Sequence, residues 1–200
     1  MMILRSSLPS PFGRKVKIAA HHLQLIDRIR IEIADTNDPS DTLRSQNPLG
    51  KIPALILEDG SVLYDSRVIL ECLDTLAGGG RIIPVGLTRF EVLVMQALAD
   101  GIMDAALLQV YEGRFRPSEM RSQPWLDHHA GKVARGLAAL ESTLGPFEGV
   151  VDVGTISIAC MLGYLDLRFE GRWRTDHPRL VAWIEAFAHH VPSYDLTRPN

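Results

Sequence analysis

Apolar and polar positions follow two different periods along the chain, and the change falls near residue 80. In the first part, "RIRIEI" (28–33) alternates charged residues with three isoleucines, which is typical of a half-buried strand. Another short strand is expected around Ile3 and Leu4. The runs 52–57 and 61–65 flank the pair Asp59-Gly60, which suits a tight turn, so we predict that they form an antiparallel hairpin.

Two segments of the same part have helical spacing instead. One starts at Phe12 and keeps its apolar residues on one face as far as Leu23, and the other runs from Ser66 to Leu76. The expected order is therefore β-α-β, a connection, and then β-β-α. Arg14 and Lys15 are expected on the solvated face of the first helix.

Residues 78–87, "GGGRIIPVGL", interrupt this pattern with three successive glycines and a proline, and we predict that they form a linker. Every strong segment of residues 88–200 has helical period, so this part is expected to be an all-α domain. The segment 155–169 is apolar nearly all round, which predicts a buried central helix. Thr155 is followed three residues later by Ile158, so no reciprocal N-terminal cap is expected there.

Composition and charge narrow the possible partners. The 200 residues include 46% hydrophobic and 22% charged residues, with a net charge of −3, so neither nucleic acid nor an anionic membrane is an expected partner. Cys72 and Cys160 are far apart and lack the spacing of metal ligands, which fits a reducing, cytoplasmic location. The adjacent histidine pairs point in different directions on a helix, and no metal site is expected.

Ser10 stands directly before the first predicted helix and is followed by Pro11, which suits the first helical position. The same place is the carboxyl end of the first strand, where open α/β sheets bind ligands. A helix N-terminus also favours an anion. Ser10 is therefore expected to cap the helix and to contact a bound anion, although Ser7 in the same loop is an alternative.

The segment from residue 47 to residue 66 indicates the chemical class of the ligand. In "NPLGKIP" (47–53), Pro53 opens a strand and leaves the backbone groups of Ile52 free to pair with an extended peptide. Asp65 and Ser66 then begin a helix and offer a carboxylate, a hydroxyl and N–H groups, which suit the ammonium and carboxylate of an amino acid. Together these features predict a site for a small extended peptide.

These motifs, in this order, resemble the glutathione S-transferase family over essentially the whole chain. The matching stretches are "SPFGRKV" (10–16), "NPLGKIP" (47–53), "YDS" (64–66) and "HPRLVAWIEAF" (177–187), and the helical half is most similar to small bacterial serine-type members. The resemblance implies an α+β thioredoxin-like domain over residues 1–77, a helical domain over 88–200, and a homodimer.

The resemblance also implies roles for single residues. Ser10 would donate a hydrogen bond to the glutathione sulfur as a stabiliser of the thiolate rather than as a nucleophile. Lys51 would approach the glycine carboxylate, and Asp104 would reach the partner subunit's glutathione across a dimer interface. Ile52 would pair with the cysteinyl backbone, with Pro53 in cis, and Asp65 and Ser66 would hold the γ-glutamyl group. The implied glutathione-binding residues are Ser10, Phe12, Lys51, Ile52, Pro53, Asp65, Ser66 and Asp104.

The implied reaction is attack of the glutathione thiolate on an electrophilic small molecule, a detoxifying transferase activity with glutathione as co-substrate. Met103, Leu107 and Tyr111 are candidates for the wall of the co-substrate pocket, although Met103 and Leu107 also fit a core face. Asp100 and Asp104 form either a solvated acidic edge or part of a cleft lining. Two other functions stay open at this point: glutathione-dependent reduction of peroxides or disulfides, and non-catalytic binding of a partner protein.

Overall fold

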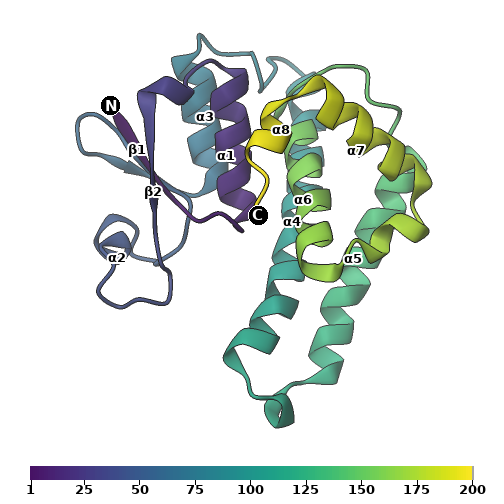
Figure 1. The fold of residues 1–200 in the computed structure, drawn as a ribbon. Coiled ribbons are helices and arrows are strands. Elements are labelled where there is room, and N and C mark those ends of the chain that lie inside the picture. Colours follow the sequence, from purple (N-terminus) through teal and green to yellow (C-terminus); the bar gives the residue numbers. More distant parts are fainter. Residues whose placement is uncertain (200) are drawn as a thin grey trace.

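The computed structural model describes residues 1–199 and begins with a four-stranded mixed sheet (Figure 1). Its strand order is β2-β1-β3-β4, where β1 pairs parallel with β2 and antiparallel with β3, and β3 pairs antiparallel with β4. Helices α1 and α3 pack against each other beside the sheet. The bounds are β1 (Met2–Ser6), α1 (Pro11–His22), η1 (Ile26–Arg28), β2 (Ile29–Ile33), α2 (Leu43–Gln46), β3 (Ala54–Ile56), β4 (Val62–Leu63) and α3 (Ser66–Leu76).

The rest of the described chain is helical. The long helix α4 packs against both α5 and α6, and α6 also packs against α1, so it joins the two parts of the molecule. The bounds are α4 (Thr88–Phe115), η2 (Ser118–Met120), α5 (Gln123–Thr143), α6 (Val153–Phe169), η3 (Arg172–Thr175), α7 (Pro178–His190) and α8 (Ser193–Leu196). The predicted fold class, a small mixed sheet with helices followed by an all-helical part, is confirmed.

The predicted strands are present, but β2 is less buried than its alternation suggests. Only Ile29 is buried, whereas Ile31 and Ile33 are exposed. Because β2 is the edge strand, it has a neighbour on one side only, and its apolar residues beyond Ile29 stay accessible to solvent. The predicted central helix α6 is buried along most of its length.

The prediction that Arg14 and Lys15 lie on a solvated face is wrong. Lys15 is fully buried and Arg14 nearly so, because the outer face of α1 packs against α6 and α8. Lys15 Nζ lies 2.5 Å from Asp100 Oδ1 of α4. Arg14 donates to the Tyr194 carbonyl oxygen at 2.6 Å and its guanidinium carbon lies 4.0 Å from the centre of the Tyr194 ring.

A glycine makes this position of Arg14 possible. A Cβ added at Gly163 of α6 would come within 2.4 Å of an Arg14 guanidinium nitrogen, so any larger residue would displace the arginine. The absence of a Cβ at Gly163 therefore lets α1 and α6 approach each other with a charged side chain between them.

The expected absence of a reciprocal cap on α6 is also wrong. The cap starts one turn earlier, with Asp152 in the N-cap position and Thr155 as its partner. The Thr155 N–H donates to Asp152 Oδ1 at 2.8 Å, and the Asp152 N–H donates to Thr155 Oγ1 at 2.9 Å. The two residue types occupy the capping box in the reverse of the usual order, which is why the search for Ser or Thr first missed it.

The segment between α3 and α4 has no helix or strand, but it is held firmly. The carboxylate of the buried Asp74 accepts hydrogen bonds from the backbone N–H groups of Gly80, Arg81 and Ile82 at 2.8–2.9 Å. Ile82 is fully buried, and its carbonyl accepts from the Val153 N–H at the start of α6. The helical part is therefore anchored directly to the end of α3.

Residues 1–199 contain neither a membrane-spanning helix nor a cluster of metal-ligating side chains. None of their helices is long and apolar enough to cross a bilayer. No group of three or more His, Cys, Asp or Glu side chains lies close enough together to hold a metal ion.

Candidate functional site

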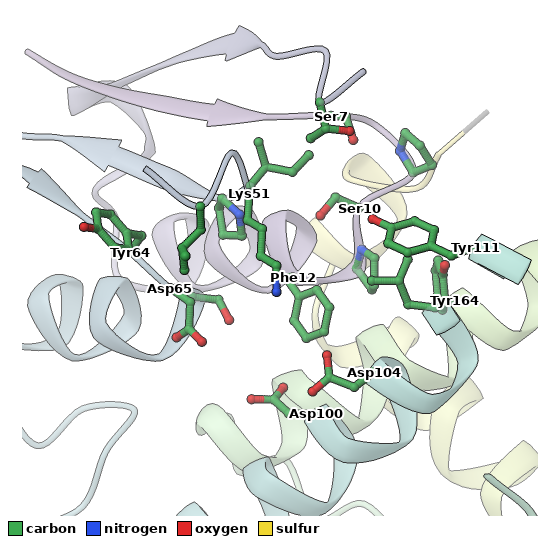
Figure 2. A pocket seen from close by; sticks show the side chains of 18 of the residues that line it. Ser7, Ser10, Phe12, Lys51, Tyr64, Asp65, Asp100, Asp104, Tyr111 and Tyr164 are labelled. Carbon is green, nitrogen blue, oxygen red and sulfur yellow. The ribbon is translucent and has the colours of Figure 1, made fainter. Parts of the chain in front are cut away.

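A cleft of about 630 Å³ lies between the sheet side of the molecule and helices α4 and α6. Its lining brings together the loop after β1, the loop before β3, the start of α3 and one face of α4. Figure 2 shows Ser7 and Ser10 on one side of it, Asp65 toward one end, and Tyr111 and Tyr164 toward the other. Of the predicted residues, the cleft is lined by Ser7, Ser10, Phe12, Lys51, Ile52, Pro53, Asp65, Ser66, Asp104, Leu107 and Tyr111.

Ser10 is the N-cap of α1, and its side-chain oxygen accepts a hydrogen bond from the Gly13 N–H at 3.1 Å. A serine hydroxyl can accept and donate together, so its proton remains available to a ligand in the cleft. Gly13 is needed because α1 comes very close to β1 here: a Cβ at this position would clash with Ser6 Oγ at 2.0 Å. This close approach brings the start of α1 and the end of β1 together at the cleft.

The loop 47–53 is fixed by a buried asparagine. The Asn47 side chain donates to the Lys51 carbonyl at 2.8 Å and accepts from the Leu49 N–H at 3.0 Å. The Ile52–Pro53 peptide bond is cis, as the family resemblance implied. Ile52 lies outside the strand ladder of β3, so its backbone groups are open toward the cleft.

The start of α3 adds a carboxylate and two hydrogen-bonding groups. Asp65 is the N-cap of α3, and one of its carboxylate oxygens accepts from the Arg67 N–H at 2.9 Å. Ser66 is only 2% exposed and is the first residue of α3. The second Asp65 oxygen, the Ser66 hydroxyl and the helix N-terminus therefore share one end of the cleft.

Three charged side chains contact one another at the Asp65 end of the cleft. Asp100 of α4 is almost fully buried, and its two carboxylate oxygens contact Lys15 at 2.5 Å and Arg67 Nε at 3.0 Å. The hydrogen bond from Arg67 to Asp100 raises the pKa of the guanidinium. Sequence reasoning placed neither Lys15 nor Arg67 here, and it left Asp100 undecided between a solvated edge and a cleft lining.

Asp104 lies one turn further along α4 and lines the cleft of its own chain. Its carboxylate is exposed to the cleft, yet the surrounding walls remove enough water to raise its pKa. The negative charge of Asp100 raises this pKa further, while Arg67 and Lys51 lower it. The end of the cleft near Asp65 thus combines acidic and basic groups.

The opposite end contains aromatic and basic side chains from α4 and α6. Leu107 and Tyr111 line it as predicted, together with Arg114, Tyr164 and Arg168, which sequence reasoning missed. Met103 does not line the cleft, because it is fully buried in the hydrophobic core. The core interpretation of Met103 is therefore the correct one.

With this geometry established, comparison with known proteins places the chain. A family model described as the glutathione S-transferase N-terminal domain matches residues 9–76, and one for the C-terminal domain matches residues 123–186. The Escherichia coli (strain K12) protein YibF, described as an uncharacterized GST-like protein, is 35% identical over 189 residues, which cover 92% of each chain. The protein belongs to the glutathione S-transferase family.

Solved structures of family members agree along the full length. A glutathione transferase family member from Pseudomonas fluorescens Pf-5 with bound glutathione has a TM-score of 0.91 and 41% identity, with both chains covered completely. The same bacterium's protein has also been solved with bound S-(propanoic acid)-glutathione. A Methylobacillus flagellatus KT glutathione S-transferase with glutathione bound has a TM-score of 0.89 and 37% identity, again over 100% of each chain.

The site residues that sequence reasoning missed were hidden for two reasons. A helical pattern assigns the charged side chains of Arg67, Arg114 and Arg168 to solvent. Tyr164 lies in a helix that is apolar nearly all round, so it looks like a core residue. A faint signal was present for α6, because Tyr164 and Arg168 are four residues apart and occupy one helix face. Nothing in the sequence shows that this face meets the cleft.

Proposed function

We propose that this protein is a glutathione transferase that activates the thiol of glutathione at Ser10 for attack on electrophilic small molecules. The observation that carries the proposal is the Ser10 hydroxyl. It lies at the N-terminus of a twelve-residue helix, lines the cleft, and already accepts a hydrogen bond from Gly13.

The physical argument concerns the ionisation of the thiol. A free thiol has a pKa of about 8.5, so only about 3% is thiolate at pH 7. The Ser10 hydroxyl donates to the sulfur anion, and its acceptance from Gly13 polarises the O–H bond and strengthens that donation. With the positive end of the α1 dipole, a shift of about two pKa units, or about 2.7 kcal/mol, makes thiolate the main form.

The remaining parts of glutathione have matching groups in the cleft. The backbone of Ile52 pairs with the cysteinyl residue, and Lys51 attracts the glycine carboxylate. Ser66 and the N-terminus of α3 receive the γ-glutamyl carboxylate, while Asp65 attracts its ammonium group. The resemblance assigned Asp104 to the partner subunit's glutathione, but because Asp104 lines the cleft of its own chain, we assign it to the same ammonium group. Phe12 and cis-Pro53 complete the wall. The relatives from P. fluorescens and M. flagellatus, which have glutathione bound, support glutathione as the ligand.

A transferase is favoured over a disulfide reductase by the residue type at the start of α1. Reduction through a mixed disulfide needs a cysteine there, and this chain has serine. The two cysteines lie elsewhere, and Cys160 is buried, which raises the pKa of its thiol to about 11. Both cysteines are free, which supports a reducing compartment such as the cytoplasm as the place where the enzyme removes electrophiles.

We also infer that the active form is a homodimer. Arg89 of α4 pairs with Glu71 of α3, so the start of α4 and α3 adjoin. This surface carries several exposed apolar side chains, a composition that favours association with a second copy. They are Val68, Leu76, Leu87, Phe90 and Val94.

The test is calorimetric titration with reduced glutathione in two buffers that differ in ionisation enthalpy. We expect binding with release of close to one proton at pH 7, and loss of that release in Ser10→Ala. Conjugation of a neutral aryl halide should fall about 10²-fold in the same variant. Ser7→Ala is the matched control, and it should keep both properties.

Two results would contradict the proposal. Absence of glutathione binding would remove the transferase function altogether and favour an interaction protein. Proton release that survives in Ser10→Ala but disappears in Ser7→Ala would move the activating role to Ser7.

A further inference from the structure

The end of the cleft that the proposed glutathione does not fill contains a buried hydroxyl whose proton has no acceptor within residues 1–199. Tyr164 of α6 is only 3% exposed, and its neighbour there is the Arg168 guanidinium, one turn along the same helix, which acts on the phenol by its charge and as a hydrogen-bond donor. Nε of Arg168 makes no hydrogen bond in that part of the chain. Buried polar groups are normally paired, so the phenol proton and the remaining guanidinium N–H groups are available to a ligand at this wall of the cleft.

Two guanidinium groups are presented at the same end. The Arg168 guanidinium carbon lies 5.9 Å from the Tyr164 ring centre, and that of Arg114 lies 5.4 Å from the ring centre of Tyr111. Both arginines line the cleft, and neither forms an ion pair with any residue from 1 to 199. Both guanidiniums lie within cation–π distance of an aromatic ring, a contact that leaves their N–H groups available.

The acidic residues of the cleft do not neutralise the positive charges of Arg114 and Arg168. The acidic side chains in its lining are Asp65, Asp100 and Asp104. Asp100 is paired with Lys15 and Arg67, and Asp104 interacts electrostatically with Arg67, Lys51 and Asp65. Burial raises the pKa of Tyr164, and the cations that lower it are Arg168, by its charge and a hydrogen bond, and Arg114. One end of the cleft therefore holds two cations and two phenols without an anion.

We propose that the electrophilic co-substrate carries a carboxylate, which Arg168 and Arg114 bind together with the Tyr164 hydroxyl. This inference rests on the proposed transferase function, because it places the carboxylate beyond a sulfur held at Ser10. Burial raises the pKa of Tyr164, so its phenol is protonated and donates at neutral pH. Guanidinium groups recognise carboxylates through paired N–H donors.

An α,β-unsaturated carboxylate shows how this arrangement promotes the reaction. The glutathione sulfur forms a bond to the β-carbon, and the π electron pair moves toward the α-carbon and the carboxylate. The α-carbon then takes a proton from water, which received the thiol proton on ionisation, so no other reactant is needed. The carboxylate gains negative charge during attack, and the two guanidiniums stabilise that charge.

The decisive experiment measures affinities for a matched pair of conjugates by calorimetry. S-(2-carboxyethyl)glutathione carries the carboxylate, and S-(2-carbamoylethyl)glutathione replaces it with a neutral amide of the same shape. We expect the wild-type protein to bind the carboxylate about 10-fold or more tightly than the amide. Unmodified glutathione is titrated in parallel as the reference for the proposed function.

Variants separate recognition from structure. Arg168→Gln should reduce the preference for the carboxylate about 10-fold, Tyr164→Phe and Arg114→Gln about 3- to 5-fold each, and none should change affinity for glutathione. Arg168→Lys should restore part of the preference. Arg172→Gln is the control, because Arg172 is 77% exposed and pairs with Glu170 outside the cleft.

Each result is decisive for one proposal. Glutathione binding with equal affinities for the two conjugates, or a preference that survives in all three variants, would overturn the carboxylate assignment and leave the transferase standing. Absence of binding by glutathione itself would overturn the proposed function and this inference with it.

Discussion

The two ends of the cleft treat charge in opposite ways. At the end near Asp65, the buried charges are paired: Asp100 contacts both Lys15 and Arg67, at 2.5 and 3.0 Å. At the end near Tyr164, Arg114 and Arg168 lie near aromatic rings and form no ion pair within residues 1–199. The cations at both ends come from helices around the same cleft. The two ends therefore differ in the groups that each cation contacts rather than in the kind of element that carries it.

Pairing determines what each charge contributes. A buried ion pair offsets its own desolvation only while both members are present, so the loss of one member destabilises the fold. An arginine on the cleft wall without an ion pair contributes little to folding and keeps its binding capacity for a ligand. We therefore expect substitutions at the paired end to act on stability and those at the unpaired end to act on specificity.

The largest expected effect is that of Lys15→Met. This change leaves the buried Asp100 with Arg67 alone, and Arg67 is 55% exposed in its side chain. The free energy of unfolding should fall by about 3 kcal/mol because one buried charge loses its nearest partner. Urea denaturation followed by circular dichroism measures this change directly.

Lys17→Met is the matched control for that experiment. Lys17 lies two residues further along α1 and is also buried, but it forms no ion pair within residues 1–199. Burial lowers the pKa of its ammonium, which means that its charge is unfavourable there. Its replacement should change the free energy of unfolding by less than about 1 kcal/mol. Equal losses in the two variants would contradict the role assigned to pairing.

The same pair of lysines shows where sequence reasoning succeeds and where it stops. The period of the apolar residues predicted the helices and strands, and local motifs indicated the cleft loops around Ser10, Ile52 and Asp65. These features depend on neighbours in the sequence. The burial of Lys15 depends on Asp100, which is 85 residues away, and on packing between two parts of the chain.

The other errors have the same origin. Arg14 is buried by Tyr194, which is 180 residues away in the sequence. The helical period identifies the apolar and polar faces of α1 but does not show which elements pack against each face. Met103 and Leu107 share a face in the sequence pattern, but the helix exposes only Leu107 to the cleft. Arg168 was invisible as a site residue because nothing local distinguishes it from a solvated arginine.

Arg67→Gln should have the next largest effect. Arg67 donates to Asp100 but is more than half exposed, while Lys15 continues to pair with that carboxylate. The loss of stability should therefore be about 1 kcal/mol, well below that of Lys15→Met. Glutathione affinity should also fall several-fold, because the start of α3 loses a fixed neighbour. A loss as large as that of Lys15→Met would show that Arg67 is the main partner of Asp100.

Arg168→Gln extends the comparison to the other end of the cleft. Since this arginine has no ion pair within residues 1–199, its removal should change the free energy of unfolding by less than about 0.5 kcal/mol. Thermal unfolding of the wild type and variant, recorded without ligand, measures this directly. A decrease above about 2 kcal/mol would mean that the guanidinium supports the fold through packing, and that the two ends do not differ as described.

The smallest effect is expected at Asp104, which lies at the paired end but forms no ion pair in residues 1–199. Its pKa is raised above the ordinary 3.8, mainly by burial and then by Asp100. Between 3.8 and the raised pKa, the folded chain holds a proton that the unfolded chain releases, so stability falls as pH increases. Asp104→Asn should remove this fall and gain stability relative to wild type from pH 4 to 7.

Urea midpoints at several pH values between 4 and 7 measure that trend, with Asp59→Asn as a control whose difference from wild type should stay nearly constant in this range. Hydrogen bonds from Ser61 lower the pKa of Asp59, so its contribution to stability is present above its unfolded pKa and is lost as pH falls. If the difference between Asp104→Asn and wild type stays constant with pH, Arg67 and Lys51 fully offset the burial of Asp104. That carboxylate would then behave as a paired charge, and the paired end of the cleft would extend one helical turn further toward Tyr111.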